Sequence, residues 1–355
     1  MAHEIRRTRE SWVDIAKVLP CVLIVLAHVF QNLVNENILE STTTYSWFIR
    51  TVNYFVFPLL FIVSGYLYQL GTPVKTVDDW KKSAKKHIVA LGVPFVLFAG
   101  VNCLVKTLFS GNIANCGDVF LQEMLIQPVS PYWALYILAI VFLLTPTLNN
   151  GTSALLIVGI AAATKGVSLF LGTVDFYALD TLFGYWLWFA LGMVLAFYKA
   201  PKALRKQKIA VVFGMALLLL FVTGSVALMV RQVNTGVVGF IFGVCGCSAV
   251  VILTISAKFT EGTKKVLRWM SDYIMPVFLM HTIFAACIRN VLLNLGVTNA
   301  VVHVAAGLTV SFVCPVLVGV ILKKLKWAEF ILYPAKFMKF GQEEKSNRSK
   351  KVQER

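Results

Sequence analysis

Apolar residues in this chain of 355 residues are grouped into ten long segments, which short polar segments separate. A helix needs about 20 mainly apolar residues to cross the hydrocarbon layer of a membrane. The segments of this kind lie at 12–34, 47–70, 88–109, 132–148, 153–173, 181–198, 209–230, 236–257, 272–294 and 299–322. The pattern predicts an all-α polytopic membrane protein with about ten transmembrane helices.

Charge placement adds a topology to this prediction. Only 14% of the residues are charged, against about a quarter in a soluble domain. Most of the 33 Lys and Arg residues fall in alternate connections and the two ends, at 6–9, 75–86, 199–208, 258–268 and 323–355. The other connections carry only one basic residue, Arg231. Their charged residues are otherwise acidic: Glu36, Glu40, Asp118, Glu123, Asp175 and Asp180.

Because connections rich in Lys and Arg stay in the cytoplasm, both the N-terminus and the C-terminus are predicted to be cytoplasmic. The formal net charge of +16 then follows from membrane topology, so we expect the lipid bilayer and not a nucleic acid as a partner. The expected location is the plasma membrane, the inner or cell membrane of a bacterium. Nothing in the pattern points to a particular oligomeric state.

No connection is long enough to fold alone, so we expect one transmembrane domain over residues 1–325 and a cytoplasmic tail over 326–355. Residues 327–340 mix aromatic residues with Lys and suggest an interfacial segment that Pro334 interrupts. Residues 341–355 are charged and predicted to be disordered. The seven cysteines lie mostly in apolar segments without metal-ligand spacing, so neither a metal nor a permanently bound cofactor is expected.

The first apolar segment carries the clearest candidate chemistry. Lys17 and His28 are eleven residues apart, which is three helical turns plus about 20°, so both lie on one face about 16 Å apart along the axis. Asp14 lies on the same stripe, within about 40° of His28. Ionisable groups inside a membrane are costly and usually functional, so the stripe is expected to line a cavity or tunnel. In the alternative, Lys17 snorkels to the interface and pairs with Asp14, while His28 bonds a neighbouring helix.

Three further residues are weaker candidates for substrate binding. Ser64 supplies a hydroxyl at depth in the second segment, although a Ser-Gly pair is more often a packing feature. Trp133 lies at the outer edge of the fourth segment, where an aromatic belt explains it about as well as a site does. His281 lies about nine residues into the ninth segment, just past Pro276. Two deep histidines make a shared polar cavity more plausible than either does alone.

Taken together, these segments resemble the acyltransferase 3 family of membrane O-acyltransferases, particularly its branch related to fucose 4-O-acetylases. The resemblance rests on four elements of this chain: Asp14, Lys17 and, after ten intervening residues, His28; Phe55 to Pro58 followed by Phe61, Ser64, Gly65 and Tyr66; Trp133 with Leu135; and Phe278 with His281. It covers roughly residues 9 to 325. Two positions depart from the family pattern: Val18 replaces a Gly, and Val56 replaces a His that in relatives precedes the proline by two.

The resemblance implies transfer of an acyl group, usually acetyl, from cytoplasmic acetyl-CoA to a hydroxyl of a cell-surface polysaccharide or lipid-linked glycan. His28 would then remove the hydroxyl proton or carry the acyl group itself. Lys17 would hold a CoA phosphate or the thioester carbonyl, and Asp14 would orient Lys17. His281 would line the acceptor cavity or assist proton transfer.

Two other functions fit the sequence pattern. A transporter or flippase would use the stripe of Asp14, Lys17 and His28 as a proton or substrate pathway, but no internal repeat supports it. A membrane sensor or scaffold with a decayed site is the third possibility. The retained Lys17 and His28 speak against decay, but the departures at Val18 and Val56 keep this hypothesis open.

Overall fold

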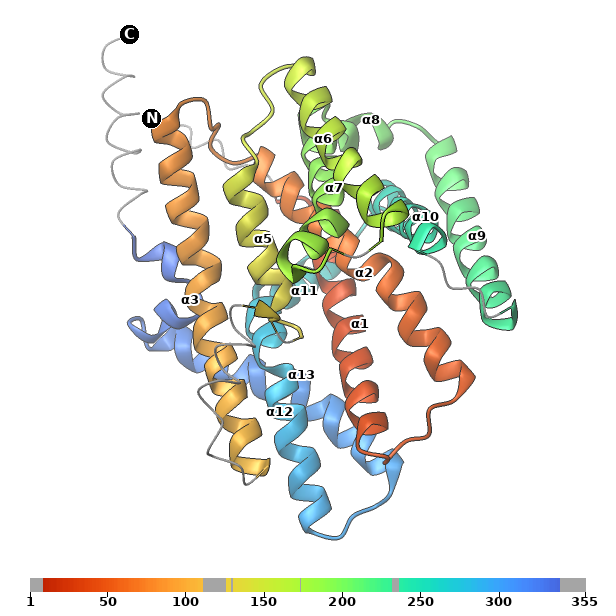
Figure 1. Ribbon diagram of the computed structural model, residues 1–355, viewed down its shortest axis with the longest axis vertical. Coiled ribbons are helices and arrows are strands. Elements are labelled where there is room, and N and C mark those ends of the chain that lie inside the picture. The colour runs from red at the N-terminus through yellow and green to blue at the C-terminus, as the bar shows by residue number, and fades with distance from the viewer. Residues whose placement is uncertain (1–8, 111–125, 129, 173, 232–235, 339–355) are drawn as a thin grey trace. The chain divides into compact units, whose positions relative to one another are not determined.

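The computed structural model describes residues 9–110, 126–128, 130–172, 174–231 and 236–338 (Figure 1). The described residues form helices, turns and connections without a strand, which confirms the all-α prediction. Among them, nine helices are long and apolar enough to cross a membrane. These are α1 (Ser11–Asn35), α2 (Thr43–Gln69), α3 (Val77–Ser110), α6 (Gly151–Phe170), α7 (Tyr177–Phe197), α9 (Ile209–Arg231), α10 (Gly236–Ser256), α12 (Ile274–Asn294) and α13 (Ala300–Lys324).

The remaining predicted span, 132–148, is shorter than expected. Its helix α5 (Trp133–Leu144) has 12 residues and a length of about 18 Å, against a hydrocarbon thickness of about 30 Å. The chain continues without helical structure, and Thr145 and Leu148 are buried. The Tyr68 hydroxyl donates to the Thr145 carbonyl at 2.8 Å, while the Gln69 amide donates to the Leu148 carbonyl at 2.9 Å and accepts from its N–H at 2.8 Å. Side chains thus replace the missing helical hydrogen bonds, as irregular backbone in a membrane protein requires.

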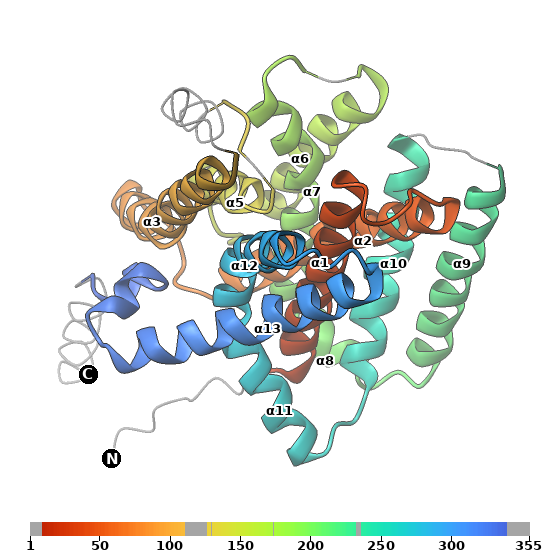
Figure 2. The same ribbon diagram turned by 90° about the horizontal axis from the view of Figure 1, so that it is seen from below.

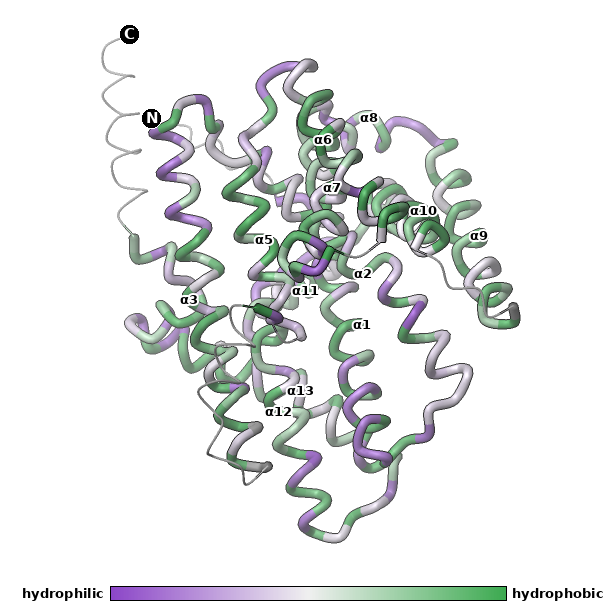
Figure 3. The backbone as a smooth tube through the Cα atoms, in the orientation of Figure 1, coloured by the Kyte–Doolittle hydropathy of each residue, from purple (hydrophilic) through white to green (hydrophobic). Residues whose placement is uncertain are grey.

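Helix α3 begins at Val77, well before the predicted residue 88. A capping box explains the early start, because the Thr76 hydroxyl accepts from the Asp79 N–H at 3.1 Å and the Asp79 carboxylate accepts from the Thr76 N–H at 3.0 Å. The first turns of α3 are hydrophilic and the rest is mainly apolar (Figure 3). The basic segment predicted as a connection is therefore part of a helix of 34 residues.

The chain divides into two compact units. The first consists of Met1–Leu67 and Trp188–Ile274, and the second of Tyr68–Leu187 and Met275–Arg355. Helices α2 and α7 contribute to both. The first unit also holds the short helix α8 (Ala200–Leu204) and the polar helix α11 (Glu261–Asp272), both of which lie in segments predicted as connections.

In the first unit, α9 and α10 lie side by side (Figures 1 and 2), and α10 and α11 both contact α1. Its closest crossing joins α2 and the second part of α7. A Cβ placed on Gly65 would overlap the carbonyl of Phe189, and one placed on Gly192 would overlap the carbonyl of Ile62. Two glycines therefore let the two backbones touch, as small residues do between membrane helices.

In the second unit, α3 and α5 lie side by side (Figure 2). The start of the tail also packs on α3, through the 3₁₀ turns η2 (Ala328–Ile331) and η3 (Pro334–Lys336). Leu332 is buried and Trp327 is exposed, so the described part of the predicted interfacial segment, 327–338, has one side in the protein. The predicted disorder of 341–355 lies outside the described residues, as do Asp118 and Glu123.

Candidate functional site

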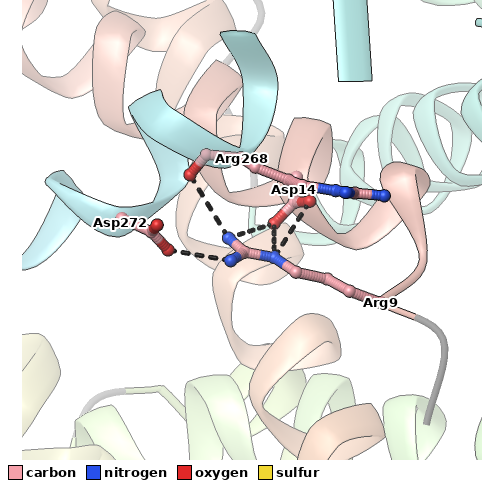
Figure 4. Close-up of polar contacts among 4 residues, drawn as sticks. All are labelled: Arg9, Asp14, Arg268 and Asp272. Carbon is pink, nitrogen blue, oxygen red and sulfur yellow. Dashed lines mark hydrogen bonds and ion pairs between the residues drawn. The ribbon is translucent and has the colours of Figure 1, made fainter. Parts of the chain in front are cut away.

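The N-terminal end of α1 is held by an arginine that joins it to α11 (Figure 4). The Arg9 guanidinium donates from Nε to both carboxylate oxygens of Asp14, at 2.9 and 3.2 Å, and its Nη2 lies 2.7 Å from Oδ1. Its Nη1 donates to the Asp272 carboxylate at 2.8 Å, and its Nη2 donates to the Arg268 carbonyl at 3.4 Å. Asp14 is only 2% exposed, so Arg9 neutralises a buried carboxylate and connects two helices.

Arg9 keeps its positive charge in this position. Burial lowers the pKa of the guanidinium, but hydrogen bonds to Asp14 and Asp272 and their negative charges outweigh this, so the pKa lies above its ordinary value. The pair of carboxylates therefore faces a permanent cation.

A second network holds the same end of α1 from other helices. The Glu10 carboxylate accepts from the Trp12 indole N–H at 2.6 Å and from the Tyr66 hydroxyl at 3.1 Å, and it lies 3.5 Å from an Arg205 guanidinium nitrogen. The Trp12 and Tyr66 rings meet edge to face, with centroids 4.7 Å apart. Tyr66 belongs to α2 and Arg205 follows α8. Together with the Arg9 contacts to α11, these contacts fix the start of α1 against three neighbouring elements of the first unit.

The alternative interpretation of the sequence paired Asp14 with Lys17, but the hydrogen-bonded cation of Asp14 is Arg9. The hydrogen bonds of Asp14 run to Arg9, which the charge pattern had placed only among the cytoplasmic basic residues, with no role at the site. Lys17 lies one turn further along α1, half-buried. It experiences attraction from the carboxylates of Asp14 and Asp272 and repulsion from Arg9.

Lys17 and His28 lie on one unbroken helix, as the sequence predicts, even though Pro20 lies between them. Both are half-buried, and His28 makes contacts with its surroundings. The separation of about 16 Å along the axis and the shared face therefore hold in the folded chain. Ser64, in α2, is half-buried, and the neighbouring Gly65 is required by the crossing with α7.

In the second unit, two backbone carbonyls hold the imidazole of His281 through its Nδ1 atom. His281 is fully buried, and its Nδ1 lies 2.9 Å from the Val277 carbonyl and 3.0 Å from the Phe278 carbonyl. Carbonyl oxygens only accept, so Nδ1 carries a hydrogen that points at these two oxygens. The Ser311 hydroxyl donates to the His281 carbonyl at 3.2 Å. His28 belongs to the first unit and His281 to the second, so a cavity shared by both stays a prediction.

Trp133 begins α5 and packs on the ring of Tyr185, with centroids 5.0 Å apart. Tyr185 lies eight residues, about 12 Å, from the start of α7 at Tyr177. Trp133 therefore lies beside the third turn of α7, about 12 Å along that helix from its start. The adjacent Tyr132 is fully buried and donates from its hydroxyl to the Leu279 carbonyl at 2.9 Å, which joins α5 to α12 two residues before His281.

Comparison with known proteins gives the class of the molecule. A family model described as an acyltransferase domain matches residues 10–320, which span both units. No curated protein and no solved structure matches the chain significantly. The helices and the family match together define a multi-pass membrane acyltransferase. The chain belongs to the acyltransferase 3 family.

Proposed function

We propose that this membrane acyltransferase transfers an acetyl group from cytoplasmic acetyl-CoA to a hydroxyl of a cell-surface or lipid-linked glycan. The observation that carries the proposal is the unbroken helix α1, on which Lys17 and His28 share one face at different depths. Membership of an acyltransferase family favours this function over the transporter and sensor hypotheses. We place both chain ends in the cytoplasm and the protein in the plasma membrane, because the basic connections then lie inside.

His28 is the proposed general base. A sugar hydroxyl is a poor nucleophile until a positioned group accepts its proton, and imidazole titrates in the useful range. As the hydroxyl oxygen bonds to the thioester carbonyl carbon, its proton passes to His28. The carbon–sulfur bond breaks, and the departing CoA thiolate takes the proton from His28. The products are the O-acetylated glycan and free CoA.

Lys17 is the proposed contact for the cytoplasmic part of the donor. A separation of about 16 Å along α1 is too long for Lys17 and His28 to reach the same carbonyl. With His28 at the thioester, Lys17 fits a phosphate of CoA or the neighbouring part of its chain better than the carbonyl oxygen. In this proposal Arg9 and Asp14 position α1 and do not touch the reacting atoms.

The test compares O-acetylation of surface glycans and glycolipids, by mass spectrometry, in cells with wild type, His28→Ala, or no protein. We expect wild type to add acetyl groups and His28→Ala to lose them. Leu26→Ala is the matched control, because it shortens a half-buried side chain on the opposite face of the same helix. Acetylation by His28→Ala at the wild-type level, with equal expression, would refute the role of His28.

A further inference from the structure

A polar and aromatic cluster lies within the second unit, whereas Lys17 and His28 belong to the first. It is formed by the start of α5, the end of α6 and the start of α7. Six-residue connections, 145–150 and 171–176, join these helices, so consecutive helices run in opposite directions and these three ends lie at the same side. In the topology proposed above, that side faces away from the cytoplasm.

The cluster contains a lysine at membrane depth. Lys165 lies five residues before the end of α6, and its ammonium donates to the Gly184 carbonyl in α7 at 3.1 Å. The Asp180 carboxylate, one turn nearer the start of α7, interacts electrostatically with this ammonium and accepts from the Val174 N–H at 3.2 Å. A charged side chain in a spanning helix is costly, and a function is the default explanation for one.

An aromatic surface lies at the same depth. Tyr185 follows Gly184 directly, and its ring packs on Trp133 with an angle of 45° between the planes. Both side chains are half-buried. Tyr177 is near enough to both Asp180 and Tyr185 to interact with them electrostatically. Flat aromatic faces thus lie beside one cation, one anion and a phenol hydroxyl.

This combination selects a class of ligand. Sites for small ligands combine apolar and aromatic walls with a few placed polar groups. One positive and one negative group cancel, so the cluster suits a neutral molecule, and Asp180 disfavours an anion. A sugar ring presents C–H groups for an aromatic face and hydroxyls that donate to a carboxylate and accept from an ammonium.

We propose that Trp133, Tyr185, Lys165 and Asp180 form a binding subsite for a neutral sugar of the acceptor glycan. The inference rests on the proposed function, because it takes the acceptor to be a glycan. Trp133 and Tyr185 stack on the sugar ring, and Lys165 and Asp180 hydrogen-bond its hydroxyls. These four residues bind and orient the acceptor and do not take part in proton transfer.

The test uses the full chain in lipid nanodiscs and the neutral glycan fraction from cells that lack the protein. Transfer of radiolabelled acetyl from acetyl-CoA is measured against the concentration of this fraction and, separately, against acetyl-CoA. We expect Trp133→Leu and Lys165→Met to raise the half-saturating glycan concentration at least tenfold and to leave that of acetyl-CoA unchanged. Asp180→Asn should raise the half-saturating glycan concentration by a smaller factor. Trp327→Leu, which removes a tryptophan that is 75% exposed elsewhere in the second unit, should match wild type.

Unchanged glycan dependence in both Trp133→Leu and Lys165→Met would overturn the subsite. A parallel rise in half-saturation for glycan and acetyl-CoA would also overturn it, since that marks a structural role. If wild type transfers no acetyl at all, the proposed function fails. The subsite is then tested separately, by direct binding of the neutral glycan fraction in the absence of acetyl-CoA. Saturable binding by wild type that Trp133→Leu loses would support it, and equal binding or none would overturn it.

Discussion

Arg9 and Asp14 form an ion pair whose two members have unlike surroundings. The Arg9 side chain is 40% exposed, whereas that of Asp14 is 3% exposed. A buried carboxylate that loses its cation keeps the cost of leaving water without the compensating attraction. The stability of this pair therefore depends on the environment of Asp14 more than on that of Arg9.

Replacement of Arg9 by Met should lower the free energy of unfolding by about 1–3 kcal/mol, less than for a fully buried pair because water reaches Arg9. Lys336→Met is the control. This substitution breaks the 2.6 Å ion pair between Lys336 and Glu329. Because the Lys336 side chain is 57% exposed, the free energy of unfolding should fall by less than about 1 kcal/mol. Thermal unfolding of both variants in the same lipid measures the difference. Equal shifts in the unfolding midpoint would show that Asp14 does not need Arg9.

The proposed role of Lys17 predicts a change in donor binding. Lys17→Met should raise the half-saturating concentration of acetyl-CoA at least tenfold, because an uncharged side chain loses its attraction for a phosphate. Lys17→Arg should recover most of the affinity, since it keeps the charge. The measurement is acetyl transfer at saturating glycan. A fall in the maximal rate with unchanged acetyl-CoA dependence would instead place Lys17 at the reacting thioester.

At the residue scale, sequence spacing predicted the common face of Lys17 and His28, because one helix sets both positions. It did not predict the partner of Asp14. Arg9 precedes the apolar segment, and Asp272 lies far away in the sequence, so no local spacing brings them together. The position of Trp133 beside α7 was also open, because it follows from a contact with Tyr185 on another helix.

At the element scale, the crossing of α2 and α7 depends on two glycines. Gly65→Ala should lower the free energy of unfolding by about 1–3 kcal/mol, because the added methyl overlaps the Phe189 carbonyl and the backbones must separate. Gly159→Ala is the control. Apart from its chain neighbours and the backbone of its own helix, no atom lies within 4 Å of its Cβ position in α6, and alanine there should be neutral or stabilising by up to about 1 kcal/mol. Thermal unfolding tests both, and a stable Gly65→Ala would rule out the tight crossing.

Most helices were predictable because an apolar segment of sufficient length has few other structures available in a membrane. The errors have local causes. Helix α3 begins early because Thr76 and Asp79 cap it, which hydropathy does not register. Helix α5 ends early because Tyr68 and Gln69 hydrogen-bond the chain beyond it, and those partners lie about 77 positions away in the sequence. The polar helix α11 was missed because it carries no apolar segment.

At the scale of the whole molecule, the short helix α5 decides which sides the two chain ends occupy. Nine crossings would leave the ends on opposite sides, whereas a tenth returns the C-terminus to the side of the N-terminus. The segment after α5 is buried, and side chains hydrogen-bond its backbone, so it can lie within the membrane and lengthen the span. We therefore expect α5 and this segment together to cross the membrane.

Reporter fusions at each end test this topology. A cytoplasm-active fluorescent protein should be active at both the N-terminus and the C-terminus, and a reporter active only outside should be silent at both. Activity of opposite reporters at the two ends would show that α5 does not carry the chain across.

The contact of Gly65 with Phe189 and of Gly192 with Ile62 also limits how the first unit can move. Where two helix backbones meet without side chains between them, sliding one past the other would drive each carbonyl into the opposing chain. Within this unit, we therefore expect α2 and the second part of α7 to move together, so that a displacement of one of these helices also displaces the other.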